Sequence, residues 1–213
     1  MSEREIPVLN YDSETRNKIM NTAMMLFAQK GFAAVSMRDI AGSVGVNTAS
    51  IYYYYAGKDA LLEDILQFFT EGYKHYFSWL SGMNEKAQSL DEVMDNMFND
   101  EFVEMRNPLS CLGMSLAVKE QHNNESARKC VFELFYEFSV QSMKEDFDKL
   151  IARGLIPPSD TQTIATMFMF FVMVSNEIRV HEYIGTEPPL DCKEMYMGLK
   201  KHITTSLEYG DKP

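Results

Sequence analysis

The sequence has few of the residues and motifs that mark secreted, metal-binding or membrane-spanning proteins. It has three cysteines in 213 residues and no Cys-x-x-Cys pair, so neither a zinc site nor a thioredoxin-like centre is predicted. The longest apolar run, residues 167–174, is far shorter than the about 20 residues that cross a bilayer. No N-terminal stretch has the apolar centre of a secretory signal. We therefore expect a soluble, cytoplasmic protein with no membrane partner.

Signatures of catalysis are missing as well. The sequence contains no nucleophile elbow, no phosphate-cradling glycine loop, no dinucleotide fingerprint and no metal-spaced His/Cys set. Glu71 and His75 are one helical turn apart, a spacing more typical of a surface pair than of an acid–base pair. We expect no enzyme, no cofactor and no metal. The cysteines are expected to be buried and reduced, with a redox role as the alternative: Cys111, Cys130 and Cys192.

Positive charge is scarce, which at first argues against a nucleic-acid-binding protein. The net charge is −11, but it is unevenly distributed. Residues 12–58 carry five basic and three acidic groups, whereas residues 59–213 carry 14 basic and 26 acidic groups. Exposed charges separated by more than about 10 Å are largely screened, so an acidic body does not keep a mildly basic N-terminal face from DNA. We expect modest non-specific affinity.

Strand patterns are nearly absent, and apolar residues recur at helical spacing along most of the chain. The sequence therefore predicts an all-α fold, with a polar loop over residues 81–89. The nine expected helices cover about residues 13–30, 36–43, 47–53, 58–80, 90–105, 109–120, 126–153, 161–184 and 191–209.

Residues 36–62 have the pattern of two short helices joined by a tight turn. Ser36 and Asp39 have the spacing of a capping box. Gly45 supplies a turn that requires a positive φ, and Asn47 is a good N-cap for the next helix. The outward face of that helix carries small or hydroxyl-bearing side chains and no acid, which suits the DNA major groove.

This stretch resembles the DNA-binding region of the tetracycline-repressor (TetR) family of bacterial transcription regulators. The resemblance covers about the first third of the chain, and the chain departs from the family pattern at Ala49, Tyr54 and Tyr55. It implies an N-terminal helix-turn-helix domain and a C-terminal helical domain for ligand binding and dimerisation, which we place at residues 12–57 and 58–213, after a disordered arm over 1–11. The matching residues are Ile19, Ala23, Leu26, Phe27, Gly31-Phe32, Ser36, Ile40-Ala41, Gly45-Val46, Ile51-Tyr52, Tyr54-Tyr55 and Lys58-Asp59-Ala60-Leu61.

Nine side chains are expected at the DNA surface. Arg38 suits a bidentate contact to guanine, the alternative being an exposed surface cation. Lys58 begins a helix, where a cation and free backbone N–H groups suit a phosphate. Tyr53 and Tyr55 are expected to face the core instead. The expected DNA contacts are Ser36, Arg38, Asn47, Thr48, Ala49, Ser50, Tyr52, Tyr54 and Lys58.

One helix-turn-helix unit of this size contacts only a few base pairs. Useful specificity for double-stranded DNA therefore needs two such units in a homodimer. Helix 161–184 is apolar nearly all round, and helix 191–209 has a seam at intervals of four residues. Two such helices from each subunit would form a four-helix bundle. The alternative is that helix 161–184 is an internal core helix. The seam residues are Met195, Leu199, Ile203 and Leu207.

The body is rich in methionine and aromatic residues, which form adaptable apolar pockets. The family resemblance implies a cavity for a small-molecule effector, which we expect to be apolar or amphipathic. The acidic body favours a neutral or cationic effector over an anion. The alternative is that the same side chains merely fill a core. The candidates are Tyr73, Phe77, Phe98, Phe102, Met114, Phe135, Phe138, Met169, Met173 and Glu177.

Taken together, the residues and the resemblance predict a ligand-responsive repressor that binds a palindromic operator as a dimer. An activator of the same fold is one alternative. A ligand-binding helical protein without DNA function is another.

Overall fold

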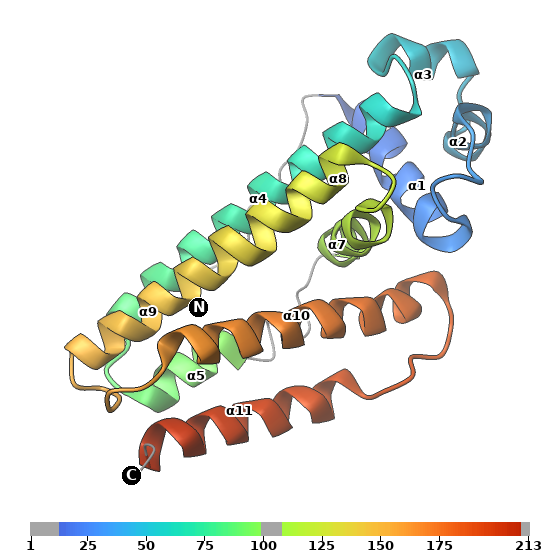
Figure 1. Cartoon of the computed structure of the whole chain (residues 1–213). Helices are drawn as coiled ribbons and strands as arrows, with labels where there is room; N and C mark the ends of the chain where they lie inside the picture. Colours follow the sequence, from blue (N-terminus) through green and yellow to red (C-terminus); the bar gives the residue numbers. More distant parts are fainter. Residues whose placement is uncertain (1–12, 99–107, 210–213) are drawn as a thin grey trace.

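The computed structural model describes residues 13–98 and 108–209 of the chain (Figure 1). Within these two ranges every regular element is a helix, as the all-α prediction requires. The elements are α1 (Glu14–Lys30), α2 (Met37–Val44), α3 (Thr48–Tyr54), α4 (Lys58–Lys86), α5 (Leu90–Phe98), α7 (Pro108–Glu120), α8 (Glu125–Cys130), the π-helical segment η1 (Val131–Ser139), α9 (Val140–Ala152), α10 (Thr161–Ile184) and α11 (Cys192–Tyr209).

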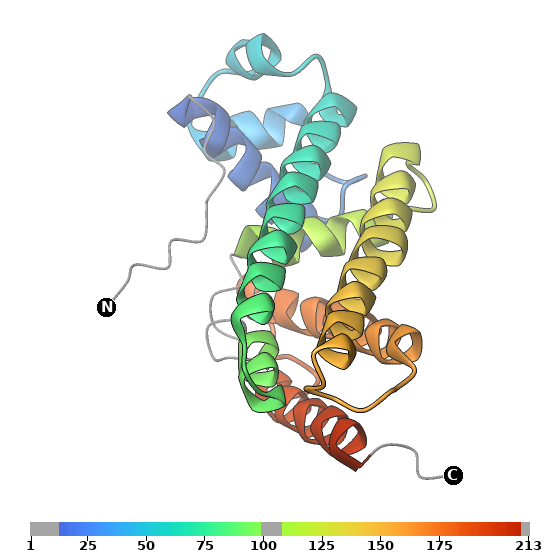
Figure 2. The same cartoon turned by 90° about the vertical axis from the view of Figure 1, so that its left-hand side faces the viewer.

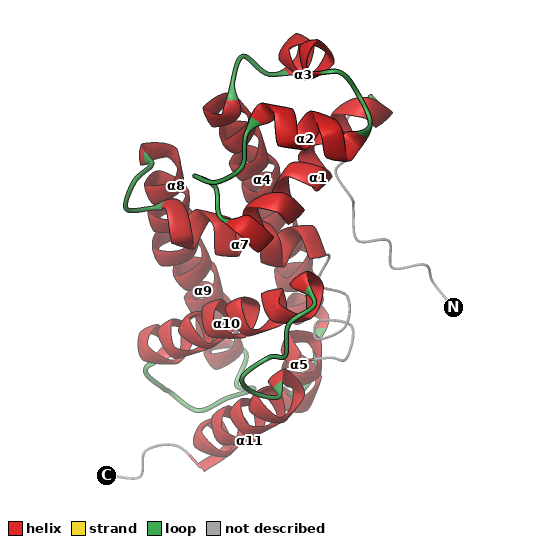
Figure 3. Cartoon of the chain, turned by 90° about the vertical axis from the view of Figure 1, so that its right-hand side faces the viewer, coloured by secondary structure: helices red, strands yellow, loops and turns green. Residues whose placement is uncertain are grey.

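The helices form an elongated molecule with the first three at one end (Figure 1). We call α1–α3 the head and the remaining helices the body. α4 leaves the head and runs along the body, with α8, η1 and α9 packed beside it (Figure 2). α7 lies between the head and α10 and contacts both, as well as α4 (Figure 3).

Apolar side chains of the head and the body form one continuous core. Ile19, Ile40 and Ile51 come from the three head helices, and each is completely buried. Leu61 and Ile65, in the first two turns of α4, are also completely buried. Burial of each such side chain contributes about 1.5–3 kcal/mol to folding. The head is therefore packed onto the start of α4 rather than tethered by a linker.

α4 is longer than the sequence predicted. It continues to Lys86, so the expected loop over residues 81–89 is wrong for its first six residues. The polar residues that suggested a loop pack against α9 instead. Ser81 Oγ donates to Asp146 at 2.5 Å, and Asn84 Nδ2 donates to the other carboxylate oxygen at 3.3 Å. Their polar character serves a helix–helix contact.

The predicted helix over 126–153 is one unbroken helix, but its middle is π-helical. Ser139 Oγ donates to the carbonyl oxygen of Leu134, five residues earlier, at 2.6 Å. The wider π turn is uncommon and occurs often at functional positions in helices. The predicted helix over 90–105 is present as far as Phe98, and residues 99–105, with the candidate Phe102, lie outside the described residues.

The apolar seam of α11 packs inward. Ile203 and Leu207 are buried, and Met195 and Leu199 lie partly buried against the core. α11 rests on α5 and α10 of its own subunit. Part of the seam is thus used inside the subunit, and a dimer contact through α11 stays a prediction.

α10 is the one described helix that is long and apolar enough to span a membrane, with a mean hydropathy of 1.3. Half of its apolar window is buried inside the protein, where it packs against α7, α9 and α11. Arg179, near its C-terminal end, is buried as well. These contacts are those of a core helix in a helical protein.

Candidate nucleic-acid interface

The two helices of the expected reading unit begin with the predicted caps. Ser36 and Asp39 form a capping box: Asp39 N–H donates to Ser36 Oγ at 3.2 Å, and Ser36 N–H donates to the carboxylate at 2.8 Å. The Ser36 hydroxyl, which donates to the Asp39 carboxylate at 2.6 Å, and the Ser36 N–H lower the pKa of Asp39. Gly45 ends α2 with a left-handed φ of 81°. Asn47 Oδ1 then accepts from Ser50 N–H at 2.8 Å, which starts α3.

α3 is anchored from one side and leaves the other side open. Ile51 and Tyr55 are buried and fix the helix on the head. Ala49 and Tyr52 are exposed on its free side, next to the half-buried Thr48 and Ser50. Its sequence contains no acidic residue. This is the acid-free surface that the sequence predicted, and its contacts with DNA stay predictions.

Tyr53 is not in the core, contrary to expectation. Its side chain is 84% exposed, and its ring lies edge-on to that of Tyr54 with the centroids 5.1 Å apart. Tyr53 is two residues after Ile51 and therefore lies on nearly the opposite side of the helix. Tyr55 is four residues after Ile51, about one turn, and therefore lies on the same buried side. Helical spacing alone therefore predicts an exposed Tyr53. Tyr53 adds a second exposed hydroxyl-bearing side chain to α3, beside Tyr52.

Tyr54 has a partner inside the head. Its hydroxyl lies 3.3 Å from Ser13 Oγ, at the N-cap of α1, and its side chain is half-buried. A phosphate contact by Tyr54, as predicted, would therefore compete with this bond.

Lys58 occupies a position that the sequence did not reveal. Its ammonium donates to the carbonyl oxygens of Phe32 at 2.7 Å, Ala33 at 3.4 Å and Val35 at 2.9 Å. It also lies 4.4 Å from the centroid of the Phe32 ring, a cation–π distance. Lys58 thus joins the start of α4 to the loop between α1 and α2. Its predicted phosphate contact stays a prediction, in competition with these bonds.

A second link between the head and α4 is a triad of Arg16, Tyr55 and Asp64. Arg16 Nη2 lies 2.7 Å from Asp64 Oδ1, and the Tyr55 hydroxyl donates to Asp64 Oδ2 at 2.7 Å. Arg16 Nε also donates to the Tyr55 hydroxyl at 3.3 Å. Burial and the carboxylate raise the pKa of Tyr55, so the hydroxyl keeps its proton. The triad ties α1 and the end of α3 to α4, and so couples the head to the orientation of α4.

Some of the expected effector contacts come together in the body. Tyr73 and Phe77 of α4 face Phe135 and Phe138 around η1. The Tyr73 centroid lies 5.0 Å from that of Phe77 and 5.5 Å from that of Phe135, and the Phe77 centroid lies 6.0 Å from that of Phe138. These four rings form one aromatic cluster on the inner face of α4.

The other candidates lie elsewhere. Phe98 packs against Phe168, at 5.3 Å between centroids, where α5 meets α10. Met169 is buried, and Met173 packs partly buried on the core. The candidates therefore do not all line one site, because they belong to different helix pairs.

Met114 and Glu177 belong to the contact between α7 and α10. Met114 Sδ accepts a hydrogen bond from Asn176. Glu177 pairs with Lys119 at 3.7 Å. His181, further along α10, has its Nδ1 2.8 Å from Thr186 Oγ1.

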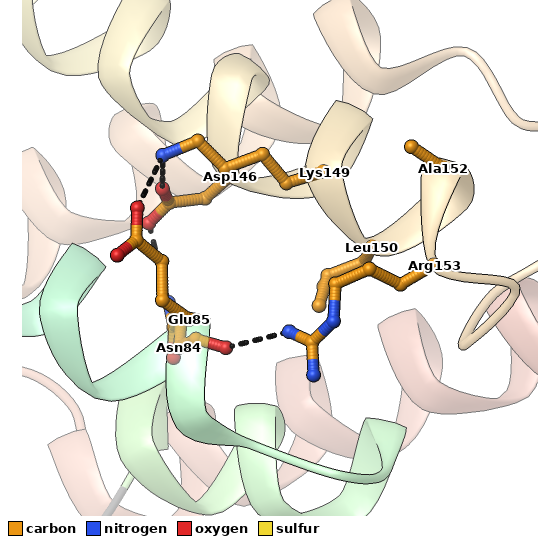
Figure 4. A pocket seen from close by; sticks show the side chains of 7 residues that line it. All are labelled: Asn84, Glu85, Asp146, Lys149, Leu150, Ala152 and Arg153. Atoms are coloured by element: carbon orange, nitrogen blue, oxygen red, sulfur yellow. Dashed lines mark hydrogen bonds and ion pairs between the residues drawn. The ribbon is translucent and has the colours of Figure 1, made fainter.

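A pocket of about 230 Å³ lies at the far end of α4, away from the head (Figure 4). Its polar groups bond one another: Lys149 pairs with Glu85 at 3.0 Å, and Arg153 donates to the carbonyl oxygen of Asn84 at 3.2 Å. This cluster fastens the end of α4 to α9. The lining residues are Asn84, Glu85, Asp146, Lys149, Leu150, Ala152 and Arg153.

The fold and the exposed face of α3 define the class of protein: an all-helical regulator that reads DNA through an N-terminal helix-turn-helix unit. The family model described as "Bacterial regulatory proteins, tetR family" matches residues 19–65. Residues 19–65 therefore have the sequence of the DNA-binding region of the TetR family of bacterial regulatory proteins.

Two curated relatives support this assignment at different lengths. "Probable HTH-type transcriptional regulator YttP" of Bacillus subtilis is 51% identical over 80 residues, which cover 38% of each chain. The negative transcriptional regulator IcaR of the biofilm operon icaADBC, from Staphylococcus aureus, is 26% identical over 151 residues. That alignment covers 64% of this chain and 77% of IcaR.

Solved structures share the fold along nearly the whole chain. Salmonella enterica GusR superposes with a TM-score of 0.67 at 18% identity, covering 94% of this chain and 99% of that one. A TetR transcription regulator from Haloarcula marismortui superposes with a TM-score of 0.66 at 15% identity, covering 91% and 96%. At these identities the likeness concerns the fold alone.

Proposed function

We propose that this protein is a cytoplasmic, ligand-responsive repressor that binds a palindromic operator as a homodimer. The observation that carries the proposal is that the exposed side of α3 has no acidic residue. α3 directly precedes α4, a long helix that also runs through the body (Figure 1). Repression is favoured over activation because IcaR, which aligns with 64% of this chain, is named a negative regulator.

The proposed contacts follow from the exposure of the head. Thr48, Ala49 and Ser50, in the first turn of α3, would meet base edges, with the Ala49 methyl suited to a thymine methyl. Arg38, exposed on α2, would bind guanine or a phosphate. The remaining candidates would bind phosphates through hydroxyl, ammonium or backbone N–H groups: Ser36, Asn47, Tyr52, Tyr54 and Lys58.

The proposed dimer surface is an exposed apolar stripe on α10 that continues onto η1. Met167, Phe170 and Val174 recur at helical spacing on α10, and each is about half exposed. The ring of Tyr136 on η1 lies 6.3 Å from that of Phe170 and 6.2 Å from that of Phe132. Contiguous apolar surface of this kind marks protein–protein contacts. The sequence predicted a dimer contact through α10 and α11, and the exposed rings add η1 to the proposed surface.

Release of DNA is proposed to follow a tilt of α4. An effector in the body that binds the two shapes of the dimer unequally would shift their populations. Because Lys58 and the Arg16–Tyr55–Asp64 triad bind the head to α4, a tilt of this helix would change the spacing of the two heads.

Selection of bound duplexes from random DNA tests the proposal. We expect an enriched palindrome whose half-sites lie about one helical turn apart. Ala49→Glu places an acid on the exposed side of α3 and should abolish this binding. Ser206→Glu places an acid at an exposed position of α11 and should leave the binding unchanged. Enrichment of no sequence, or equal binding by Ala49→Glu, would contradict DNA reading by α3. If metabolite extracts that stabilise the protein never release DNA, the ligand response is excluded.

A further inference from the structure

Buried side chains recur at strict four-residue intervals along η1 and into α9. An α-helix turns by about 100° per residue, so four residues pass a full turn by about 40°, and four such steps by about 160°. A purely α-helical segment would therefore carry this series from one side of the helix to nearly the opposite side. The series, in which each residue is no more than 2% exposed, is Val131, Phe135, Ser139, Met143 and Phe147.

The π-helical turns of η1 correct this drift. A π turn has hydrogen bonds between residues i and i+5 and takes more residues than an α turn. From Val131 to Ser139 the chain makes two turns in eight residues, where an α-helix needs about 7.2. η1 thus holds about one surplus residue. Residues 131–139 contain neither Pro nor Gly, so the same sequence can also form an α-helix.

The Ser139 side chain is fitted to the π-helical form. Its Oγ donates to the carbonyl oxygen of Leu134, five residues earlier, at 2.6 Å. In an α-helix a serine donates to a carbonyl oxygen three or four residues earlier. Ser175, equally buried in α10, does this: its Oγ donates to the carbonyl oxygen of Phe171 at 2.7 Å. The bond of Ser139 therefore stabilises the wide turn.

Aromatic rings extend from η1 toward two different helices. The ring centroid of Phe135 lies 5.5 Å from that of Tyr73 on α4. On the outer side, Tyr136 is 46% exposed, and its centroid lies 6.3 Å from that of Phe170 on α10. Phe135 and Tyr136 are neighbours in the chain, so one change of helical form moves both contacts.

The two ends of η1 are held unequally. The helix after η1 is fastened to α4: Ser81 donates to Asp146 at 2.5 Å, and Lys149 donates to Glu85 at 3.0 Å. The helix before η1, α8, has six residues, Glu125–Cys130. A surplus residue can therefore move more easily toward α8 than into α9.

We propose that η1 is a conformational switch whose surplus residue moves along the helix toward α8. When it leaves, η1 becomes α-helical, and the residues that it passes turn by up to about 100°, the angle of one residue. Phe135 then leaves Tyr73, and Tyr136 leaves Phe170, in the same step. A change in the packing on α4 is carried in this way to the apolar stripe of α10. This proposal rests on the proposed function, because it states how the body couples α4 to the dimer surface.

Two deletions test whether η1 holds a surplus residue. Removal of Glu137, exposed on η1, brings the buried series close to α-helical spacing and places Ser139 four residues after Leu134. The Tm should therefore stay within about 3 °C of that of the wild type. Removal of Glu71, exposed in α4, turns the two halves of that helix by about 100° relative to each other and should lower the Tm by about 10 °C or more. Equal losses in the two deletion variants would overturn the proposal.

Fluorine NMR of protein labelled with fluorotyrosine tests whether the surplus residue moves. Tyr136→Phe identifies the signal of Tyr136. Ser139→Ala removes the bond that stabilises the π form, so this signal should move or split. Ser175→Ala removes the matched bond of α10 and should leave the signal in place. A Tyr136 signal that stays unchanged in Ser139→Ala, or that moves equally in Ser175→Ala, would overturn the switch.

Sedimentation equilibrium tests the link to the dimer. Ser139→Ala should raise the Kd of the dimer by about tenfold, because rings of the proposed surface are displaced, whereas Ser175→Ala should not. An unchanged Kd despite a moved Tyr136 signal would exclude the coupling. A wild type that is monomeric would contradict the proposed dimer instead, and the deletions and the fluorine signal would still decide whether η1 is a switch.

Discussion

The Lys58 side chain has one observed role and one predicted role. Its ammonium holds three carbonyl oxygens of the loop before α2, and the sequence pattern suggests that it also meets a phosphate. Both roles are possible together only if a phosphate oxygen replaces one carbonyl in the complex.

We expect Lys58→Ala to lower the free energy of unfolding by about 1–2 kcal/mol, because charge-assisted hydrogen bonds are lost. We also expect it to weaken operator and random DNA equally and to reduce the slope of log affinity against log salt by about one. Chemical denaturation and salt titrations measure the two effects. A lower stability with an unchanged slope would show that Lys58 only holds the loop.

The Tyr55 hydroxyl gives a second prediction. Tyr55→Phe keeps the buried ring but removes the bond to Asp64, so the free energy of unfolding should fall by about 1 kcal/mol. Tyr52→Phe, whose ring is 53% exposed, should change it by less than about 0.5 kcal/mol. Urea denaturation of both variants measures these changes. Equal losses in the free energy of unfolding would argue against a role of the triad in holding the head on α4.

Single residues were predictable where local backbone geometry decides their role. The caps Ser36 and Asn47 and the positive φ of Gly45 concern only neighbouring residues, and all are present. The partners of Lys58 and Tyr54 were not predictable, because Phe32 and Ser13 are distant in sequence and meet them only after the helices pack.

Gly113 of α7 lies against the Phe69 side chain of α4, where the two helices approach each other closely. A Cβ on Gly113 would lie 3.0 Å from the Phe69 ring. Overpacking of this kind costs about 1–3 kcal/mol, partly offset by about 1 kcal/mol of helix propensity for alanine.

We therefore expect Gly113→Ala to lower the Tm by about 2–4 °C, and Phe69→Leu to relieve the loss in the double variant. Gly82→Ala in α4, which has no atom within 4 Å of its added methyl, should instead raise the Tm. Differential scanning calorimetry distinguishes the three. A Gly113→Ala protein as stable as Gly82→Ala would contradict the close packing.

Among the described residues the helices were predictable within about six residues, and the errors have two separate causes. Ser81 and Asn84 read as loop residues because they are polar, yet they lie in α4 and bond Asp146 of α9. The π-helical turn of η1 also escaped prediction, because the helix prediction assumed the α-helical period throughout and π-helical turns are rare.

In the proposed function, two copies of the chain read two half-sites. Phe170→Glu places a charge within the apolar stripe of α10 and should raise the Kd of the dimer by about 30-fold or more, with loss of operator binding at low concentration. Met197→Glu, at a 57% exposed position on α11, should leave the dimer intact. Sedimentation equilibrium measures both. A Phe170→Glu protein that dimerises like the wild type would exclude this surface, and disruption by Met197→Glu would move the interface to α11.

The order of helices, their caps and the acid-free face of α3 follow from the sequence alone, because they depend on spacing along the chain and on local hydrogen bonds. Three features depend on packing between distant segments: the hydrogen bonds of Lys58 to the loop before α2, the burial of Ile203 and Leu207 on α11, and the burial of Arg179 on α10. Periodicity shows that a helix has an apolar side, but it does not show which neighbouring helix covers that side. The neighbouring helix decides whether a residue lies in the core or is accessible to DNA, a ligand or a second subunit.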